Sequence, residues 1–128
     1  MSRKLDAAIA EALGKCVEWK LKCYSLKTNG YTEKDGPFIN PDPGGVHQTI
    51  CPPYSTDGNA MLELIREMRE QGYMVTIYAD KDGSYVEFGY CQSMQERPIK
   101  EYTAEADTLP EAVTLAAHYA LTGKEWKE

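Results

Sequence analysis

Apolar residues recur at steps of three and four along three segments of the chain, and this spacing predicts three amphipathic helices. The predicted ranges are 3–16, 56–71 and 108–123. The third opens on a capping box from Thr108 to Glu111, and its inner face is a narrow stripe of alanines. We expect this small-residue face to let the helix lie close to a sheet.

Other segments alternate apolar and polar residues, which predicts β-strands with one buried face. The clearest case is a hairpin, because the strands 73–80 and 85–90 flank the turn sequence DKDG, where Gly83 supplies a positive φ. Further strands are predicted at 17–24 and 101–106.

Residues 27–53 contain glycine and proline too densely for a helix, so we predict a long irregular loop there. Phe38, Ile39 and the run Val46–Cys51 could anchor this loop to the domain, as a short edge strand. The order of elements predicts one α+β domain over residues 1–128. We expect an antiparallel sheet of about four strands with helices on both faces, an α-β-α sandwich.

Charge and composition exclude some classes of function. The 128 residues carry a formal net charge of −6, which argues against binding of polymeric nucleic acid, since such binding needs a surplus of Lys and Arg. No apolar run has the length of a membrane span, and Asp6 and Glu11 interrupt any signal-peptide core, so we expect a cytoplasmic protein. The four cysteines form no C-x-x-C pair, so we expect reduced thiols, no metal site and no cofactor.

The candidate binding site is the sequence PPYSTD, which leads into the second predicted helix. The first turn of a helix has unpaired N–H groups and a partial positive charge, so it can hold phosphate or carboxylate oxygens. Ser55 and Thr56 would add hydroxyl donors, and Tyr54 would stack on a base. Asp57 would accept a ribose hydroxyl. Helix capping by Ser55, Thr56 or Asp57 explains the same residues and stays open as the alternative.

Residues from the predicted sheet complete this hypothetical site. Lys20 and Lys22 would supply positive charge to a phosphate, and Trp19 or Tyr78 would stack on the base. Asp80 is a second acceptor for ribose hydroxyls. This arrangement requires that both strands belong to one sheet beside the helix start.

Signatures of catalysis are weak. The chain contains neither G-x-G-x-x-G nor a P-loop, and DKDG lacks the remaining ligands of a calcium loop. If the chain were an enzyme, His47 would be the candidate base, because it lies in the predicted loop near Cys51.

The ordered run of motifs resembles the phage ABA sandwich domain family, a group of small bacteriophage proteins. The similarity is carried by LDAAIAEALGKCVEWK, PPYSTD, MREQGYMVTIYADKDGSYVEFG and AEADTLPEAVTLAAHYAL. The resemblance implies an α-β-α layered fold and a place in an infected bacterial host. Small phage proteins of this general kind include ones that sequester nucleotide immune signals, and no catalytic motif comes with the resemblance.

We therefore expect a non-enzymatic phage anti-defence protein that binds and sequesters a nucleotide-derived bacterial immune signal. The preferred ligand is an ADP-ribose-type molecule from TIR-domain defence, and a cyclic oligonucleotide is the second. The alternatives are an enzyme that cleaves such a signal and a protein-binding inhibitor that uses a tyrosine-rich surface. The nine tyrosines suit ligand pockets and subunit interfaces alike, and we expect a homo-oligomer.

Overall fold

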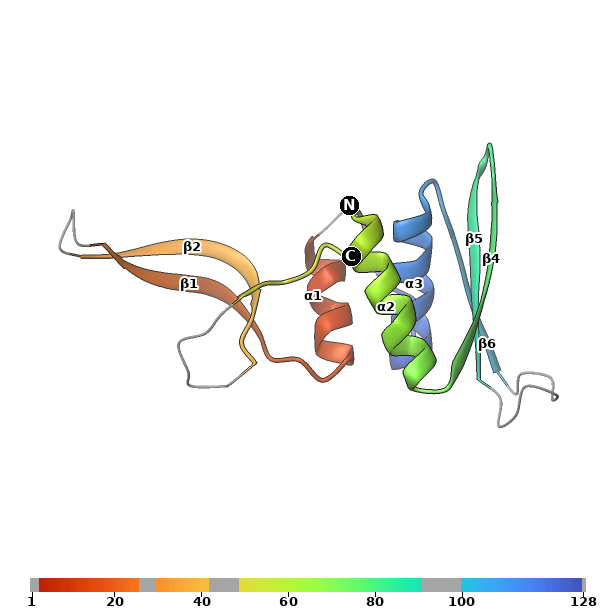
Figure 1. Ribbon diagram of the computed structural model, residues 1–128, viewed down its shortest axis with the longest axis horizontal. Coiled ribbons are helices and arrows are strands. Elements are labelled where there is room, and N and C mark those ends of the chain that lie inside the picture. Colours follow the sequence, from red (N-terminus) through yellow and green to blue (C-terminus); the bar gives the residue numbers. More distant parts are fainter. Residues whose placement is uncertain (1–2, 26–29, 42–48, 91–99, 128) are drawn as a thin grey trace.

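The computed structural model describes residues 3–25, 30–41, 49–90 and 100–127, and within these ranges it contains three helices and six strands (Figure 1). The helices are α1 (Arg3–Ala12), α2 (Gly58–Glu70) and α3 (Leu109–Thr122). The strands are β1 (Val17–Ser25), β2 (Gly30–Ile39), β3 (Thr49–Ile50), β4 (Tyr73–Asp80), β5 (Gly83–Tyr90) and β6 (Lys100–Ala106). None of the helices in these ranges combines the length and the apolar character that crossing a membrane requires.

The predicted α+β class is confirmed, but the single sheet of about four strands is wrong. The described strands form two antiparallel sheets of three strands each, with the orders β1-β2-β3 and β4-β5-β6. Figure 1 shows the three helices lying together between the β1–β2 hairpin and the β4–β5–β6 sheet. The described helices therefore cover one face of β4–β5–β6, and no described helix lies on its other face. Strand β1 pairs with its own neighbour β2, which separates it from the second sheet.

The predicted irregular loop at 27–53 is corrected by β2, which pairs with β1 along most of its length. Gly36 and Pro37 are one of the glycine–proline pairs that suggested a loop. They lie at a β-bulge, because the register skips between Glu18↔Phe38 and Lys20↔Asp35. A bulge tolerates the missing N–H of a proline. A Cβ on Gly36 would lie 2.9 Å from the Glu18 carbonyl oxygen, so the close approach of the strands requires glycine there. The short edge strand expected within Val46–Cys51 is confirmed as β3.

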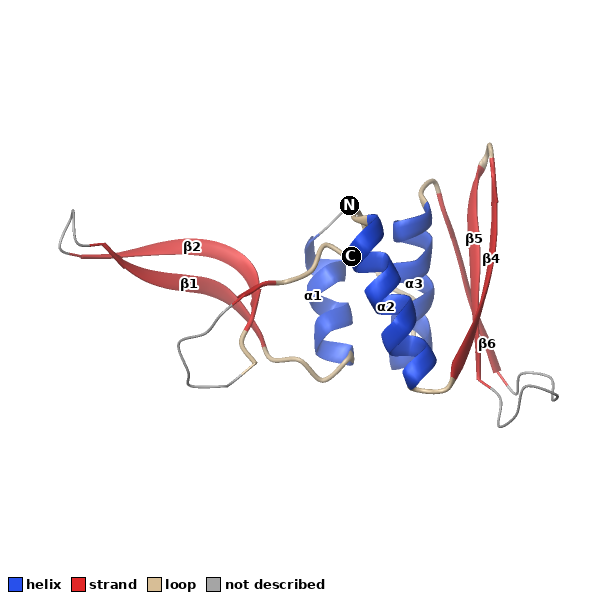
Figure 2. Cartoon of the chain, viewed as in Figure 1, coloured by secondary structure: helices blue, strands red, loops and turns tan. Residues whose placement is uncertain are grey.

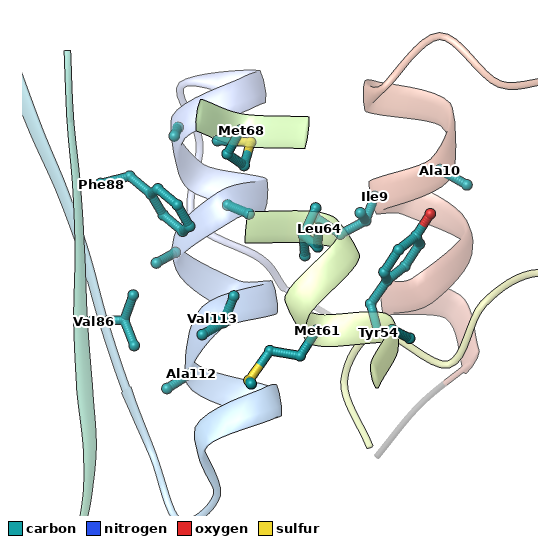
Figure 3. Close-up of a cluster of buried hydrophobic side chains, with 14 of the residues drawn as sticks. Ile9, Ala10, Tyr54, Met61, Leu64, Met68, Val86, Phe88, Ala112 and Val113 are labelled. Carbon is teal, nitrogen blue, oxygen red and sulfur yellow. The ribbon is translucent and has the colours of Figure 1, made fainter. Parts of the chain in front are cut away.

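The core lies where α3 packs between the sheet and α2. Figure 3 shows Val86 and Phe88 of β5 pointing toward α3, with Leu64 and Met68 of α2 on the other side of it. These four side chains are fully buried. The predicted small-residue face of α3 is confirmed, because Val113, Ala116, Ala117 and Ala120 are all buried in the same cluster. This packing fixes β5 against the helices, and no described element covers the opposite side of the sheet.

Candidate functional site

The helix start at PPYSTD is a capped turn. Asp57 has an extended backbone, with φ −108° and ψ 128°, and its carboxylate accepts the Ala60 N–H at 3.0 Å. Of the three capping candidates, Asp57 is therefore the residue that caps α2. The turn before it is closed by the Thr56 and Asp57 amides, which both donate to the Pro53 carbonyl.

Buried polar contacts tie this turn to α1. The Asp6 carboxylate is 1% exposed and accepts the Ser55 N–H at 2.9 Å through one oxygen and Arg3 at 2.6 Å through the other. Arg3 also donates to the Cys51 carbonyl, just before the turn. Figure 2 shows this loop running past α1 into α2. Asp6, a residue that the sequence analysis used only against a signal peptide, is thus what holds the turn.

Tyr54 is buried at 1% exposure, and its hydroxyl accepts a hydrogen bond from Lys15 Nζ at 3.1 Å. Lys15 Nζ also lies 3.2 Å from Glu67 Oε1. Burial by itself lowers the pKa of Lys15, but the contacts with Tyr54 and Glu67 outweigh it and leave that pKa raised. For Tyr54, burial acts in the opposite direction and raises the pKa of the hydroxyl. In this arrangement the Tyr54 ring is part of the core (Figure 3), and it does not present a face on which a base could stack.

The structure distributes the predicted ligand-binding residues over separate places. Ser55 is buried, and its Oγ has no hydrogen-bond partner among the described residues, whereas Thr56 is exposed. Trp19 is 46% exposed on β1, the strand that also carries Lys20 and Lys22. The side chains of these two lysines lie outside the described parts.

The expectation that one sheet joins these lysines to Tyr78 is wrong. Lys20 and Lys22 belong to the β1-β2-β3 sheet, whereas Tyr78 belongs to β4-β5-β6. The three helices lie between the two sheets (Figure 1). His47, the candidate base, lies outside the described residues.

Asp80 has a structural role in the β4–β5 turn. Its Oδ1 accepts the N–H groups of Asp82 at 2.8 Å and of Gly83 at 3.2 Å. Gly83 has a φ of +151°, as the turn chemistry predicted. The hairpin and its one core face are confirmed, with Ile77 opposite Val86 and Val75 opposite Phe88.

The side of β4–β5–β6 that faces away from the helices is the candidate site, and we call it the outer face. Besides Asp80, which closes the turn, alternation along the paired strands places eight side chains there. They are Met74, Thr76, Tyr78, Tyr85, Glu87, Glu101, Thr103 and Glu105. Tyr78 is 60% exposed, and its ring lies 5.9 Å from that of Tyr85. With Asp80 this face carries four carboxylates, and no Lys or Arg is among its described side chains.

An open cavity of about 860 Å³ lies at the hairpin tip, where the outer face ends. It is lined by both tyrosines and by Asp80, Asp82, Glu105 and Asp107, and no Lys, Arg or His is among the described residues that line it. The Tyr85 hydroxyl donates to Glu87 at 3.2 Å. Partial burial and this hydrogen bond raise the pKa of Tyr85. The cavity could not be predicted from the sequence, because its walls form only when β6 pairs with β5. The cross-strand pair Tyr78–Tyr85, in contrast, follows from the hairpin register.

A second cavity, of about 450 Å³, lies between the end of α1 and the β2–β3 strands. Lys15, Cys16, Asn40 and Pro52 are among the residues that line it. The Asn40 side chain donates to Glu18 at 2.7 Å. This cavity is less acidic than the first and is next to the one lysine that contacts Tyr54.

The described cysteine and histidine side chains differ in burial. Cys16 is an exposed free thiol, whereas Cys51 is buried and its burial raises the pKa of the thiol to about 11. The side chains of Cys23 and Cys91 lie outside the described parts. His118 packs edge-to-face on Trp126, with ring centroids 5.2 Å apart. Across the described residues, no three His, Cys, Asp or Glu side chains are grouped so that they could hold a metal ion.

Together these observations define an α+β domain whose second sheet has one face that no described helix or strand covers, and that face is acidic and carries exposed tyrosine. No protein-family model, no curated protein and no solved structure matches the chain.

Proposed function

We propose that this chain is a non-catalytic protein-binding module and that the outer face of β4–β5–β6 is its docking surface. The observation that carries the proposal is the one-sided packing of this sheet. The described helices all lie on its other face, and Tyr78 remains 60% exposed. Exposed aromatic residues on a rigid sheet suit protein recognition, because they provide a large contact area and lose little side-chain entropy on binding.

The charge of the outer face supports a basic partner. Glu87, Glu101 and Glu105 lie along it, and the cavity at its end adds Asp82 and Asp107. A Lys or Arg side chain of the partner would be attracted by these carboxylates and by the faces of the tyrosine rings. A ligand rich in phosphate would be repelled from the same surface.

The test uses two synthetic peptides, one rich in Arg and Lys and one identical except for Gln at those positions. Binding to the isotope-labelled protein is followed by amide shifts in NMR titrations at low and at moderate salt. We expect the basic peptide to shift resonances of β4, β5 and β6 and to bind more weakly as salt increases. Equal binding of both peptides, or shifts confined to other elements, would refute the proposal.

Matched variants locate the surface. Tyr78→Ala should weaken binding of the basic peptide by about 0.5–1 kcal/mol through loss of the ring. Leu62→Ala on α2, where the side chain is 59% exposed, is the control for loss of exposed apolar area. Glu105→Gln should weaken binding as well, whereas Glu63→Gln removes a carboxylate from α2 and should leave binding unchanged.

Sequestration of a nucleotide-derived signal is the second candidate, and the 450 Å³ cavity beside Lys15 favours it. Its size suits a nucleobase with its ribose, and Lys15 is a cation within reach of a phosphate. The protein is incubated with ADP-ribose derivatives and cyclic dinucleotides, and then it is denatured by heat. Mass spectrometry identifies what is released. Intact ligand released only after heating would support sequestration, a cleaved product would support the enzyme alternative, and free unchanged ligand would argue against both. Membership of the phage ABA sandwich family, and a role in an infected host, stay predictions.

A further inference from the structure

Strand β4 is the outermost strand of its sheet, and the described residues leave one side of it unpaired. The sheet order is β4-β5-β6, so β4 bonds only to β5. Each residue from Thr76 to Asp80 is exposed. We infer that a second copy of this chain pairs antiparallel with β4 along this edge, so that two three-stranded sheets join into one six-stranded sheet.

The other sheet edges among the described residues carry features that oppose such pairing, and β4 does not. Open edges in monomeric proteins are usually blunted by Lys, Pro, a bulge or a very short strand. Strand β3 has two residues, and β1 contains Lys20 and Lys22 and takes part in the bulged β1–β2 pairing. Strand β4, with the sequence YMVTIYAD, has eight residues, no lysine, no proline and no register shift.

Charge along the strands points to the same edge. In an antiparallel pair of identical strands, a residue that lies n positions before the two-fold axis faces the partner's residue n positions after it. For β6 centred on Thr103, Glu101 faces Glu105 of the partner at two positions, and like charges directly opposite are destabilising. Asp80 is the only ionised side chain of β4 and lies at its end. In a register centred on Ile77, Asp80 faces Met74 of the partner, so no like charges meet.

The apolar residues of β4 support this register. Ile77 is 40% exposed although its face of the sheet is the one that packs on the helices. A two-fold axis at Ile77 would place the two copies of this side chain next to each other on that same face. It would bury an apolar area that the single chain leaves in water. The pairing would also place two outer faces side by side, which doubles the proposed docking surface without altering it.

The test is the mass of the full chain in solution, measured by sedimentation equilibrium over a dilution series. We expect a reversible dimer of the 14.4 kDa chain at high concentration. Ile77→Lys places a charge on the two-fold axis, where the two copies of the new side chain would face each other, and we expect its dissociation constant to rise at least about tenfold. Thr103→Lys introduces the same change on β6, the other edge strand, and should leave the constant unchanged. Thermal unfolding of both variants confirms that each is folded.

Hydrogen exchange gives a second measurement that does not depend on a variant. The edge amides of β4 should exchange more slowly at high than at low protein concentration, and those of β6 should not change. A chain that is monomeric at every concentration would overturn the inference, and so would a dimer that Ile77→Lys leaves intact. The peptide titration is measured on a different surface, so failure of the dimer and failure of the docking proposal are separate results.

Discussion

Replacing Asp6 by alanine tests whether α1 holds the turn that starts α2. The carboxylate is 1% exposed and accepts two hydrogen bonds, from the Ser55 amide at 2.9 Å and from Arg3 at 2.6 Å. The contact with Ser55 joins residues 49 positions apart in the chain. The alanine variant removes both acceptors at once and leaves the Ser55 N–H buried without a partner.

The two contacts contribute unequally. An unpaired buried N–H destabilises the folded state by about 1–3 kcal/mol. The Arg3 side chain is 37% exposed, so solvent screens its ion pair and the pair adds about 0–1 kcal/mol. We therefore expect Asp6→Ala to lower the free energy of unfolding by about 2–3 kcal/mol. Asp6→Asn keeps an oxygen that can accept from Ser55, and its loss should be about half as large.

Urea unfolding at neutral pH, followed by circular dichroism, measures these differences. The control is Glu11→Ala, which changes an exposed carboxylate on the same helix and should alter stability by less than about 0.5 kcal/mol. An Asp6→Ala loss as small as that of the control would refute the reasoning. Equal losses for Asp6→Ala and Asp6→Asn would show that the charge matters and the acceptor does not.

Three further predictions concern single residues. Cys16 should be alkylated in the native protein at pH 8, whereas Cys51, whose burial raises its pKa to about 11, should react only on unfolding; peptide mass spectrometry distinguishes the two sites. Burial lowers the pKa of His118, so the unfolded chain binds the proton more tightly; stability should be unaffected well above pH 6.5 and fall as the pH decreases below it. His118→Gln should reduce this fall in urea midpoints measured at several pH values, and an unchanged fall would contradict the assignment. Gly83→Ala should destabilise by about 1–2 kcal/mol, because φ is +151° and a Cβ would lie 3.0 Å from the Ala106 carbonyl oxygen. Gly58→Ala, at a helix start with no atom within 4 Å of the added Cβ, should stabilise slightly, and thermal unfolding of both variants tests the contrast.

Local patterns were enough to predict the β4–β5 hairpin and the three helices. The hairpin follows from alternation on both sides of a turn whose own residues close it, as the Asp80 contacts show. The close approach of α3 to the sheet could also be predicted, because the whole small-residue face lies within this one helix. Helix α1 ends before its predicted end, and Gly14 follows it with a φ of +86°.

Strand β2 could not be predicted from its own composition. Its segment contains Gly36 and Pro37, which are typical of loops. Pairing with β1 overrides this preference because the irregular residues occupy a bulge that faces Trp19. The division into two sheets likewise depends on which strands pair with each other. The alternation within each strand is compatible with one sheet or with two.

The predicted site required polar side chains that are free to bind a ligand. Whether a side chain is free depends on its contacts in the fold, and the local sequence does not reveal these contacts. Tyr54 meets Lys15 from 39 positions away, and this contact turns a candidate stacking ring into a core residue. Asp57 and Asp80 are occupied by backbone amides of their own turns. In contrast, the carboxylates of Glu105 and Asp107 accept no hydrogen bond from the described residues.

The two candidate surfaces, the PPYSTD turn and the outer face, therefore differ in whether their polar side chains are already bonded within the fold. A group that already satisfies a buried amide has to break that contact before it can bind a ligand, which costs about 1–3 kcal/mol per group. At the PPYSTD turn, this penalty applies to Asp57, and Tyr54 would have to leave both Lys15 and the core. On the outer face the ring of Tyr78 is exposed and the carboxylates of Glu105 and Asp107 accept no hydrogen bond from the described residues, so a basic partner displaces only solvent and ions there. If the Arg- and Lys-rich peptide binds there and not at the turn, the difference between the surfaces is explained by which side chains the fold had already used.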